Sequence, residues 1–380
     1  MKLRISGLIA AFALAGILGS AQSLAQNAYI TNETSNNVSV INTATNTVIA
    51  TIPVDIFPFG VAVTPNGSKV YVTNATSGTV SVINTATNTV IATIQLGSEP
   101  IGVAVTPDGS KVYVANAAAN TVSVINTATN TVTATFPAEV GYGVTVTPDG
   151  SKVYVANFGS NSVSVINTAT NTVTATIPVG SLPHFVAVTP DGSRVYVTNA
   201  NSNTVSVINT ATNMVIATIP VGSTDPQAGG SYPQGVTVSP DGSKVYVANS
   251  YLANSVSVIN TATNTVIATI PVGVGPEGAA VSRDGSKVYV ANLYDNSVSV
   301  INTATNTVIA TIPVGVGPEA FGIFIQPAPR FAGTPGKTNC YGQSVSALAR
   351  QYGGLNAAAA ALGFSSVRAL QNAILAFCGG

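Results

Sequence analysis

A tyrosine motif, YVTN or YVAN with small variations, returns along this chain at an almost constant interval. The intervals are 42, 42, 41, 42, 50 and 43 residues, and the seven tyrosines are Tyr29, Tyr71, Tyr113, Tyr154, Tyr196, Tyr246 and Tyr289. A period of about 42 residues is typical of the blades of a β-propeller, in which each repeat is one four-stranded sheet. This repeat constrains the fold more than any other feature of the sequence.

Each repeat divides into four short segments with the residues of β-strands. In the repeat that begins at Gly102 they are GVAVTP, KVYVAN, TVSVIN and TVTATF, which we name strands A to D. Their Val, Ile and Thr residues favour extended backbone. PDGS joins strand A to strand B and offers a glycine where a tight turn needs positive φ. NTATN joins C to D, and its Asn and Thr side chains can bond their own backbone.

The count of strands predicts that the chain closes into a ring. There are seven B-C-D sets and seven A strands, but the first B-C-D set, 28–54, has no A strand before it. The last A strand, 322–327, has no B strand after it. We therefore predict an all-β fold: a seven-bladed propeller of four-stranded blades, closed by three N-terminal strands plus one C-terminal strand. A solenoid, the alternative, would not explain these complementary ends.

The two ends of the chain differ from the repeats. Residues 1–25 combine Lys2, Arg4, a short apolar run and small residues before a cleavage site, which predicts a signal peptide; an anchoring helix is the alternative. We expect an exported protein, periplasmic or extracellular, with no membrane span after cleavage. The further predictions are a propeller over 26–327, a linker over 328–337 and a small module over 338–380, with helices near 343–352, 355–362 and 366–377 and a Cys340–Cys378 disulfide.

The strings YVTN or YVAN, TPDGSKVYV and VINTATNTV recur in nearly every repeat. With them the chain resembles the YVTN-repeat β-propeller family over about 28–327. The resemblance implies the propeller fold and an exported location, since such repeats are similar to those of surface-layer and secreted proteins. Lactonase-type propellers look similar too, but the repeat itself carries no catalytic motif.

The loops separate the ring into two unlike faces. The A–B and C–D loops are nearly identical between repeats, and they share what we call the constant face; the B–C and D–A loops differ and share the variable face. The constant face carries about +2, from Lys or Arg set against Asp. The variable face carries about −8 and no Lys or Arg, which favours cationic ligands or basic partners. Its acids are Glu33, Asp55, Glu99, Glu139, Asp225, Glu277, Asp295 and Glu319.

The D–A residue just before each A strand is expected to overhang the central channel on the variable face. Unlike the scaffold positions, this one differs between blades: it reads Phe59, Ile101, Tyr142, His184, Gln234, Glu277 and Glu319. The candidate binding residues are therefore Phe59, Glu99, Tyr142, His184, Gln234, Glu277, Asp295 and Glu319.

His184 is the only histidine in the chain. With neighbouring carboxylates it could bind a divalent cation or perform acid–base chemistry. A solvated or packed histidine is the reading we prefer. Glu99, Glu277 and Glu319 could alternatively supply oxygen ligands to Ca²⁺, although no EF-hand-like spacing is present.

The sequence offers no recognisable catalytic set. A single histidine excludes multi-histidine metal centres, and no GxSxG, P-loop or dinucleotide-binding motif occurs. Nucleic acid is not an expected partner, because there is no basic stripe and the net charge is zero. We predict an exported binding or scaffold protein of the cell envelope whose variable face meets an unknown protein or envelope polymer. A lactonase-like or metal-dependent hydrolase at the channel mouth is the alternative.

Overall fold

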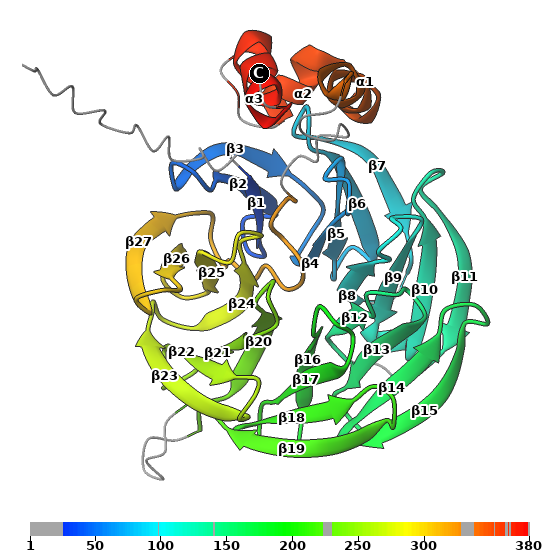
Figure 1. Cartoon of the computed structure of the whole chain (residues 1–380). Coiled ribbons are helices and arrows are strands. Elements are labelled where there is room, and N and C mark those ends of the chain that lie inside the picture. The colour runs from blue at the N-terminus through cyan, green and yellow to red at the C-terminus, as the bar shows by residue number, and fades with distance from the viewer. Residues whose placement is uncertain are drawn as a thin grey trace, which may run out of the picture.

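The computed structural model describes residues 26–97, 99–139, 141–222, 230–327, 338–352, 354–361, 364 and 366–378. Over 26–327 it is a seven-bladed propeller of antiparallel sheets, with the strands of each blade following one another outward from the central axis (Figure 1). The predicted fold class is therefore confirmed. The predicted signal peptide and linker lie outside the described residues.

Six blades are complete four-stranded sheets. Their strands are β4 (Pro58–Val63), β5 (Lys69–Asn74), β6 (Thr79–Asn84) and β7 (Thr89–Gln95); β8 (Pro100–Val105), β9 (Lys111–Asn116), β10 (Thr121–Asn126) and β11 (Thr131–Pro137); β12 (Val144–Val146), β13 (Lys152–Asn157), β14 (Ser162–Asn167) and β15 (Thr172–Pro178); β16 (Pro183–Val188), β17 (Arg194–Asn199), β18 (Thr204–Asn209) and β19 (Met214–Pro220); β20 (Pro233–Val238), β21 (Lys244–Asn249), β22 (Ser255–Asn260) and β23 (Thr265–Pro271); and β24 (Pro276–Val281), β25 (Lys287–Asn292), β26 (Ser297–Asn302) and β27 (Thr307–Pro313). A short 3-10 helix, η1 (Ala117–Ala119), lies between β9 and β10.

The seventh blade joins the two ends of the propeller. It contains β1 (Asn27–Asn32), β2 (Asn37–Asn42) and β3 (Thr47–Pro53), and the C-terminal segment 318–326 runs along β1 in place of a fourth strand. The amide of Tyr29 donates to the carbonyl of Phe324 at 2.9 Å, and the amide of Gln326 donates to the carbonyl of Asn27 at 2.8 Å. The ring is thus closed as predicted, which leaves β1 no free edge in the interior.

The hydrophobic core lies between neighbouring blades. Four of the B strands, β9 among them, read KVYVAN, and in β9 the valine and tyrosine side chains are fully buried. One typical cluster joins Tyr71 and Val82 of one blade to Val103 and Val114 of the next. Inside each blade the last asparagine of strand B donates a hydrogen bond to a serine of strand C. For example, Asn199 Nδ2 donates to Ser206 Oγ at 2.9 Å. Buried amides need such partners, so this pair fixes the register of the two strands.

The INTATN turns connect each blade to the one before it. Within a turn, Asn42 Oδ1 accepts from the amide of Ala44, and Asn46 adopts φ 55°, a left-handed conformation that asparagine tolerates. The carbonyl of Thr43 in the same turn accepts a hydrogen bond from Lys287 Nζ of the preceding blade at 2.8 Å. The same contact recurs at Lys69–Thr127, Lys111–Thr168, Lys152–Thr210, Arg194–Thr261 and Lys244–Thr303. The repeated string is therefore a docking turn between blades.

The C-terminal module is helical, as the sequence predicts, and lies beside the ring (Figure 1). Its helices are α1 (Cys340–Tyr352), α2 (Leu355–Ala361) and α3 (Val367–Cys378), so α1 begins three residues earlier than the predicted 343. A small core that includes Leu348, Leu370 and Ile374 holds them together, with Ala86 of one INTATN turn packed against it. None of the helices in the described part of the chain is long and apolar enough to cross a membrane.

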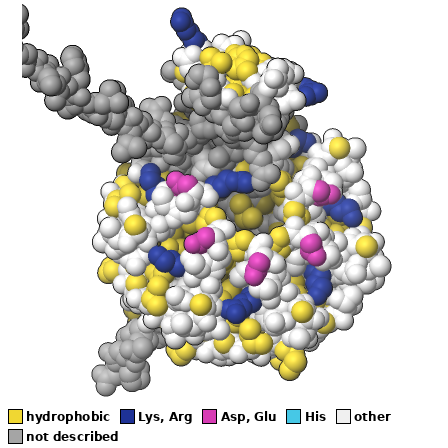
Figure 2. Space-filling view, viewed as in Figure 1, with side chains coloured by type: hydrophobic (Ala, Val, Ile, Leu, Met, Phe, Trp, Pro, Cys, Tyr) yellow, Lys and Arg dark blue, Asp and Glu magenta, His cyan; other side chains and the backbone are white. Residues whose placement is uncertain are grey.

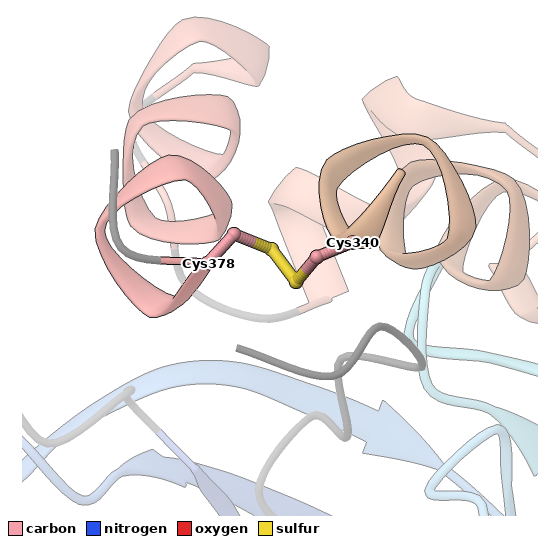
Figure 3. The surroundings of a disulfide bond; sticks show 2 residues. All are labelled: Cys340 and Cys378. Carbon is pink, nitrogen blue, oxygen red and sulfur yellow. A yellow bond between two sulfur atoms is a disulfide. The ribbon is translucent and has the colours of Figure 1, made fainter. Parts of the chain in front are cut away.

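A disulfide ties the two ends of this module together. Cys340 at the start of α1 is bonded to Cys378 at the end of α3, with the Cα atoms 5.8 Å apart (Figure 3). This is the pairing predicted from the sequence. Among the described side chains of the module, five form a fully buried or nearly fully buried core, and a cross-link is the usual supplement in a module of this size.

Candidate functional site

Hydrogen bonds confirm the division of the loops between two faces. On the constant face, Thr85 Oγ1 of a C–D turn donates to the carbonyl of Gly67 in an A–B turn at 2.6 Å. On the variable face, the amide of Ile56 in a D–A loop donates to Ser77 Oγ in a B–C loop at 2.8 Å. The seven candidate positions before the A strands lie on the variable-face side of the axis, where strands such as β4 and β16 begin.

Aromatic side chains fill the centre of the ring at this level. We call them the aromatic plug, defined as Phe59, Tyr142, His184, Phe185 and Phe321. Phe185 and Phe321 stack with ring centroids 3.8 Å apart, and Phe59 stacks on Phe321 at 5.0 Å. Tyr142 stacks on His184 at 4.8 Å. Phe59, Tyr142 and His184 were expected to overhang the central channel, and their side chains do converge on the axis. They pack against one another and against Phe185 and Phe321, so they fill the channel at this level.

Phe185 and Phe321 are plug residues that were not predicted from the sequence. Both stand close to positions where other blades have glycine: Phe185 takes the place of Gly60 and Gly102 in strand A, and Phe321 directly precedes Gly322. For Phe185, a bulky residue at a position that is otherwise glycine was the available signal. The glycines themselves are required by close packing, since a Cβ at Gly102 would lie 2.0 Å from the carbonyl oxygen of Tyr142.

His184 is a packed histidine, in line with the preferred sequence reading. Its side chain is 7% exposed, and Nδ1 is hydrogen-bonded to Oε1 of Gln234. Because the amide oxygen can only accept, Nδ1 carries the proton in this contact. Burial lowers the pKa of His184, and the bond to Gln234 opposes that shift. The ring is therefore neutral near pH 7, and its described hydrogen-bond partner is an amide and not one of the predicted carboxylates.

The carboxylates form a separate cluster beside the plug. Glu319 is hydrogen-bonded to Glu33, and Ser250 Oγ donates to Glu277 Oε1 at 2.9 Å. Burial raises the pKa of Glu277 to about 8 and raises the pKa of Glu319, with repulsion from Glu277 and Glu33 adding to the second effect. Burial also raises the pKa of Glu33, although the bond from Glu319 counteracts it. We call this set the Glu33–Glu277–Glu319 cluster; it retains protons that exposed carboxyls would release.

Two further candidates, Glu99 and Asp295, are exposed on loops of the variable face. Asp295 Oδ2 accepts from the amide of Val274 at 2.6 Å, so it braces a neighbouring D–A loop. Among the described residues no group of three His, Cys, Asp or Glu side chains is placed to hold a metal ion. The negative charge of the variable face at neutral pH is smaller than the expected −8, because the Glu33–Glu277–Glu319 cluster keeps part of its protons. Asp225, another of the predicted acids, lies outside the described residues.

A cavity of about 450 Å³ opens on the opposite side of the plug, at the constant face. The inner A strands line it with valine and alanine, Phe185 and Phe321 of the plug lie at its inner end, and A–B turn residues surround its rim. Figure 2 shows this face, with acidic and basic side chains around a central hollow lined by hydrophobic ones. We call this cavity the funnel. The site predicted from the sequence lies on the opposite, variable face, and the funnel was not predicted.

The profile of the YNCE-like beta-propeller family matches residues 61–150, 142–234 and 228–330. The chain belongs to this family. The match spans most of the ring, and it agrees with the resemblance recognised in the YVTN repeats. No curated protein matches the chain.

Solved structures give the same picture of the YNCE-like fold. A chain of hydrazine synthase from Kuenenia stuttgartiensis is 25% identical with a TM-score of 0.65, over 75% of this chain and 94% of that one. Periplasmic gluconolactonase from Pseudomonas aeruginosa is 19% identical with a TM-score of 0.66, over 78% and 98%. A putative 6-phosphogluconolactonase from Bacteroides fragilis is 20% identical with a TM-score of 0.64, over 79% and 98%. At these identities the two lactonase-type structures support the fold alone.

Proposed function

We propose that this YNCE-like propeller is an exported binding or scaffold protein of the cell envelope, and that it recognises a basic protein surface with its variable face. The Cys340–Cys378 disulfide supports an oxidising compartment, where such bonds persist. The observation that carries the proposal is a run of exposed hydrophobic side chains on the loops of this face.

These side chains lie on consecutive loops and form what we call the apolar crescent. Tyr251 and Tyr294 are 66% and 68% exposed, and the full set is Tyr251, Leu252, Val274, Tyr294, Val316, Ile56 and Phe57. Three of the other B–C loops read ATSG, AAAN and ANSN, so Tyr251, Leu252 and Tyr294 depart from these copies of the repeat. Exposed apolar patches rimmed by polar residues are typical of protein-interaction sites.

Hydrogen bonds link the loops of the crescent in sequence around the ring. The amide of Gly275 donates to Asn254 Oδ1, and the amide of Tyr294 donates to the carbonyl of Val274. Further along, the amide of Thr34 donates to the carbonyl of Val316, and the amide of Phe57 donates to Asn36 Oδ1. Because these bonds brace the loops, a partner meets a pre-organised surface and little ordering entropy opposes binding.

Charge selects the kind of partner. The described B–C and D–A loops contain no lysine or arginine. Asp55 and Asp295 lie on loops of the crescent, and Glu99 and Glu139 lie on the next two D–A loops around the same face. A surface of one sign attracts partners of the other sign and discriminates against acidic ones. A protein with apolar side chains set among lysine or arginine fits both properties of this face.

The lactonase-like or metal-dependent alternative has the fold as its only support. Its proposed residues, His184, Glu277 and Glu319, are all buried, and His184 is hydrogen-bonded to an amide. A general base must lie within reach of a substrate proton, which these side chains do not offer in the described arrangement. Hydrolysis of gluconolactone by the wild-type protein, abolished in His184→Ala, would restore this alternative.

Quantitative capture from envelope extracts tests the binding proposal. Wild type is compared with Tyr294→Ser and with the charge-reversed double variant Glu99→Lys, Glu139→Lys, in which both exposed carboxylates are replaced. We expect both variants to lose the protein that wild type retains, and added salt to weaken the capture. Ile323→Asp on the constant face is the matched control and should retain it. Equal capture by all four proteins would contradict the proposal.

A further inference from the structure

The funnel has the size of a small-molecule site and one open end. Its volume of about 450 Å³ lies within the range of about 300–1,000 Å³ that is usual for ligand pockets. The A strands line its walls, and Phe185 and Phe321 of the aromatic plug lie at its inner end. Because the plug fills the channel there, the funnel is a blind pocket that opens at the constant face.

The C-terminal segment shows what the inner edge of an A strand can bind. The segment runs parallel to β4, with Phe321 opposite Gly60. The amide of Val61 donates to the carbonyl of Phe321 at 2.8 Å, and the amide of Val63 donates to the carbonyl of Ile323 at 2.9 Å. The edge of β4 that is remote from β5 therefore binds an extended chain by main-chain hydrogen bonds.

The other A strands have the same edge, because residues of an antiparallel pair alternate in direction. At the end of β8 the amide of Thr106 donates to the carbonyl of Lys111 at 2.9 Å, so the alternate residue Ala104 also bonds to β9. Val103 and Val105 then direct their amides and carbonyls away from β9, toward the axis. Equivalent bonds orient β12, β16, β20 and β24 in the same way, and their donors are Thr147, Thr189, Ser239 and Ser282.

These inward-directed main-chain groups belong to residues that line the funnel. The residues are Val103, Val105, Val144, Val146, Val186, Val188, Val236, Val238, Ala279 and Val281. Within the described part of the chain, none of their amides makes a main-chain hydrogen bond outside the strand ladders, in contrast to Val61 and Val63. Two such amides of one strand are about 7 Å apart, which is also the spacing of alternate carbonyls in an extended peptide.

The side chains of the funnel favour an uncharged, apolar ligand. Ile323 is 70% exposed although it lines the cavity, and most of the wall is valine, alanine and proline. A ligand that covers these side chains removes apolar surface from water, which is favourable. Arg283, which stands where the other A–B turns have proline, already interacts within the chain, so it adds no preference for charge.

We propose that the funnel binds a short, uncharged, apolar peptide, which adds in extended conformation to the inner edge of an A strand as 321–323 does at β4. Main-chain hydrogen bonds hold its backbone and the walls cover its side chains, the two contributions that are usual in strand addition. The blind inner end limits the length of the peptide. This site lies on the opposite face from the apolar crescent and does not depend on the proposed partner surface.

Two blocked tripeptides with the same side chains test the main-chain contribution. N-acetyl-Val-Ile-Val-amide keeps its amide donors, and its analogue N-methylated at all three residues loses them and has a crowded edge. In calorimetric titrations of the full chain we expect one molecule of the parent peptide to bind. The analogue should bind about tenfold more weakly, because two lost hydrogen bonds contribute on that order. No binding of the parent peptide, or equal affinity for the two, would refute the proposal.

Amide spectra of ¹⁵N-valine-labelled protein identify the edge that the peptide occupies. Saturation with the parent peptide should shift the amide protons of the inward valines of at least one A strand, such as Val186 and Val188, to lower field. The amides of Val61 and Val63 are already hydrogen-bonded and should change little. Shifts confined to valines of the apolar crescent would place the peptide on the variable face and overturn the proposal.

Three variants locate the peptide independently of the spectra. Ile323→Asp places a carboxylate on the funnel wall at a largely exposed position, and it should weaken binding of the parent peptide at least tenfold. Lys152→Gln on the same face and Tyr294→Ser in the apolar crescent are the matched controls and should bind as wild type does. If Ile323→Asp binds as tightly as wild type, the peptide lies elsewhere and the proposal is wrong.

Discussion

The Glu33–Glu277–Glu319 cluster predicts an unusual dependence of stability on pH. Burial raises the pKa of Glu277 from 4.5 to about 8, so between these values the folded protein holds a proton that the unfolded chain has released. Stability must then fall as pH rises through this interval, since the folded state binds more protons. One pKa unit corresponds to about 1.4 kcal/mol, so Glu277 alone removes at most roughly 5 kcal/mol between pH 4.5 and pH 8.

Glu277→Gln is the perturbation that isolates this effect. The amide keeps an acceptor for Ser250 Oγ but cannot ionise, so we expect the variant to lose much of the decline in unfolding free energy above pH 5. It should equal or exceed wild type in stability at pH 9. The residual slope reports Glu319 and Glu33, whose pKa values are also raised.

Urea unfolding at pH 5, 7 and 9, followed by tyrosine fluorescence and circular dichroism, measures the change. Asp191→Asn is the matched control, because hydrogen bonds from Thr189 and Ser193 lower the pKa of Asp191 to about 2. That carboxyl is ionised in both states above pH 5, and its removal should shift all three measurements equally. Parallel pH profiles for wild type and Glu277→Gln would show that the cluster does not hold the proton.

Three other perturbations test the scaffold. Phe321→Ala opens the aromatic plug and should lower the unfolding free energy by about 3–5 kcal/mol in urea titrations, as is usual for buried aromatic residues; a change below 1 kcal/mol would contradict the assigned packing. Reduction of the Cys340–Cys378 disulfide, which spans 38 residues, removes a stabilisation of roughly 4 kcal/mol from the module. The helical ellipticity and the protease resistance of 338–378 should therefore decrease. The ring should unfold at the same urea concentration as before reduction. Lys152→Met removes one bond to the next INTATN turn and should cost about 1 kcal/mol; no loss would assign the interblade contact to Tyr154 and packing alone.

The architecture was predictable because it follows from repetition. Three features of the sequence each point to one simple structure: the regular intervals between tyrosines, the complementary ends 28–54 and 322–327, and the two cysteines. The helices of the module followed from a change of composition and period. The start of α1 at Cys340 was placed late, since the disulfide and packing, which a local pattern does not contain, stabilise its first turn.

The candidate site was harder to predict, because its contacts join residues far apart in the sequence. Glu33 is hydrogen-bonded to Glu319 only because the ring closes, and His184 is hydrogen-bonded to Gln234 of the neighbouring blade. The sequence marks Phe185 and Arg283 merely as departures from glycine and proline. Side-chain volumes around the whole ring decide which of these unusual residues face the axis. The same volumes decide whether such a residue fills the central channel or lines a cavity.

The INTATN turn also bears on how such a ring could arise. Six of the seven blades carry a cation and a tyrosine that engage the following turn, and the closing blade has Asn27 and Tyr29 at these positions. Both halves of the interface are therefore copied whenever the unit is duplicated, and a new unit can dock on either neighbour at once. Near-identity of the repeats is then compatible with recent copying of one self-complementary cassette, and the variable-face loops are where the copies have since been free to diverge.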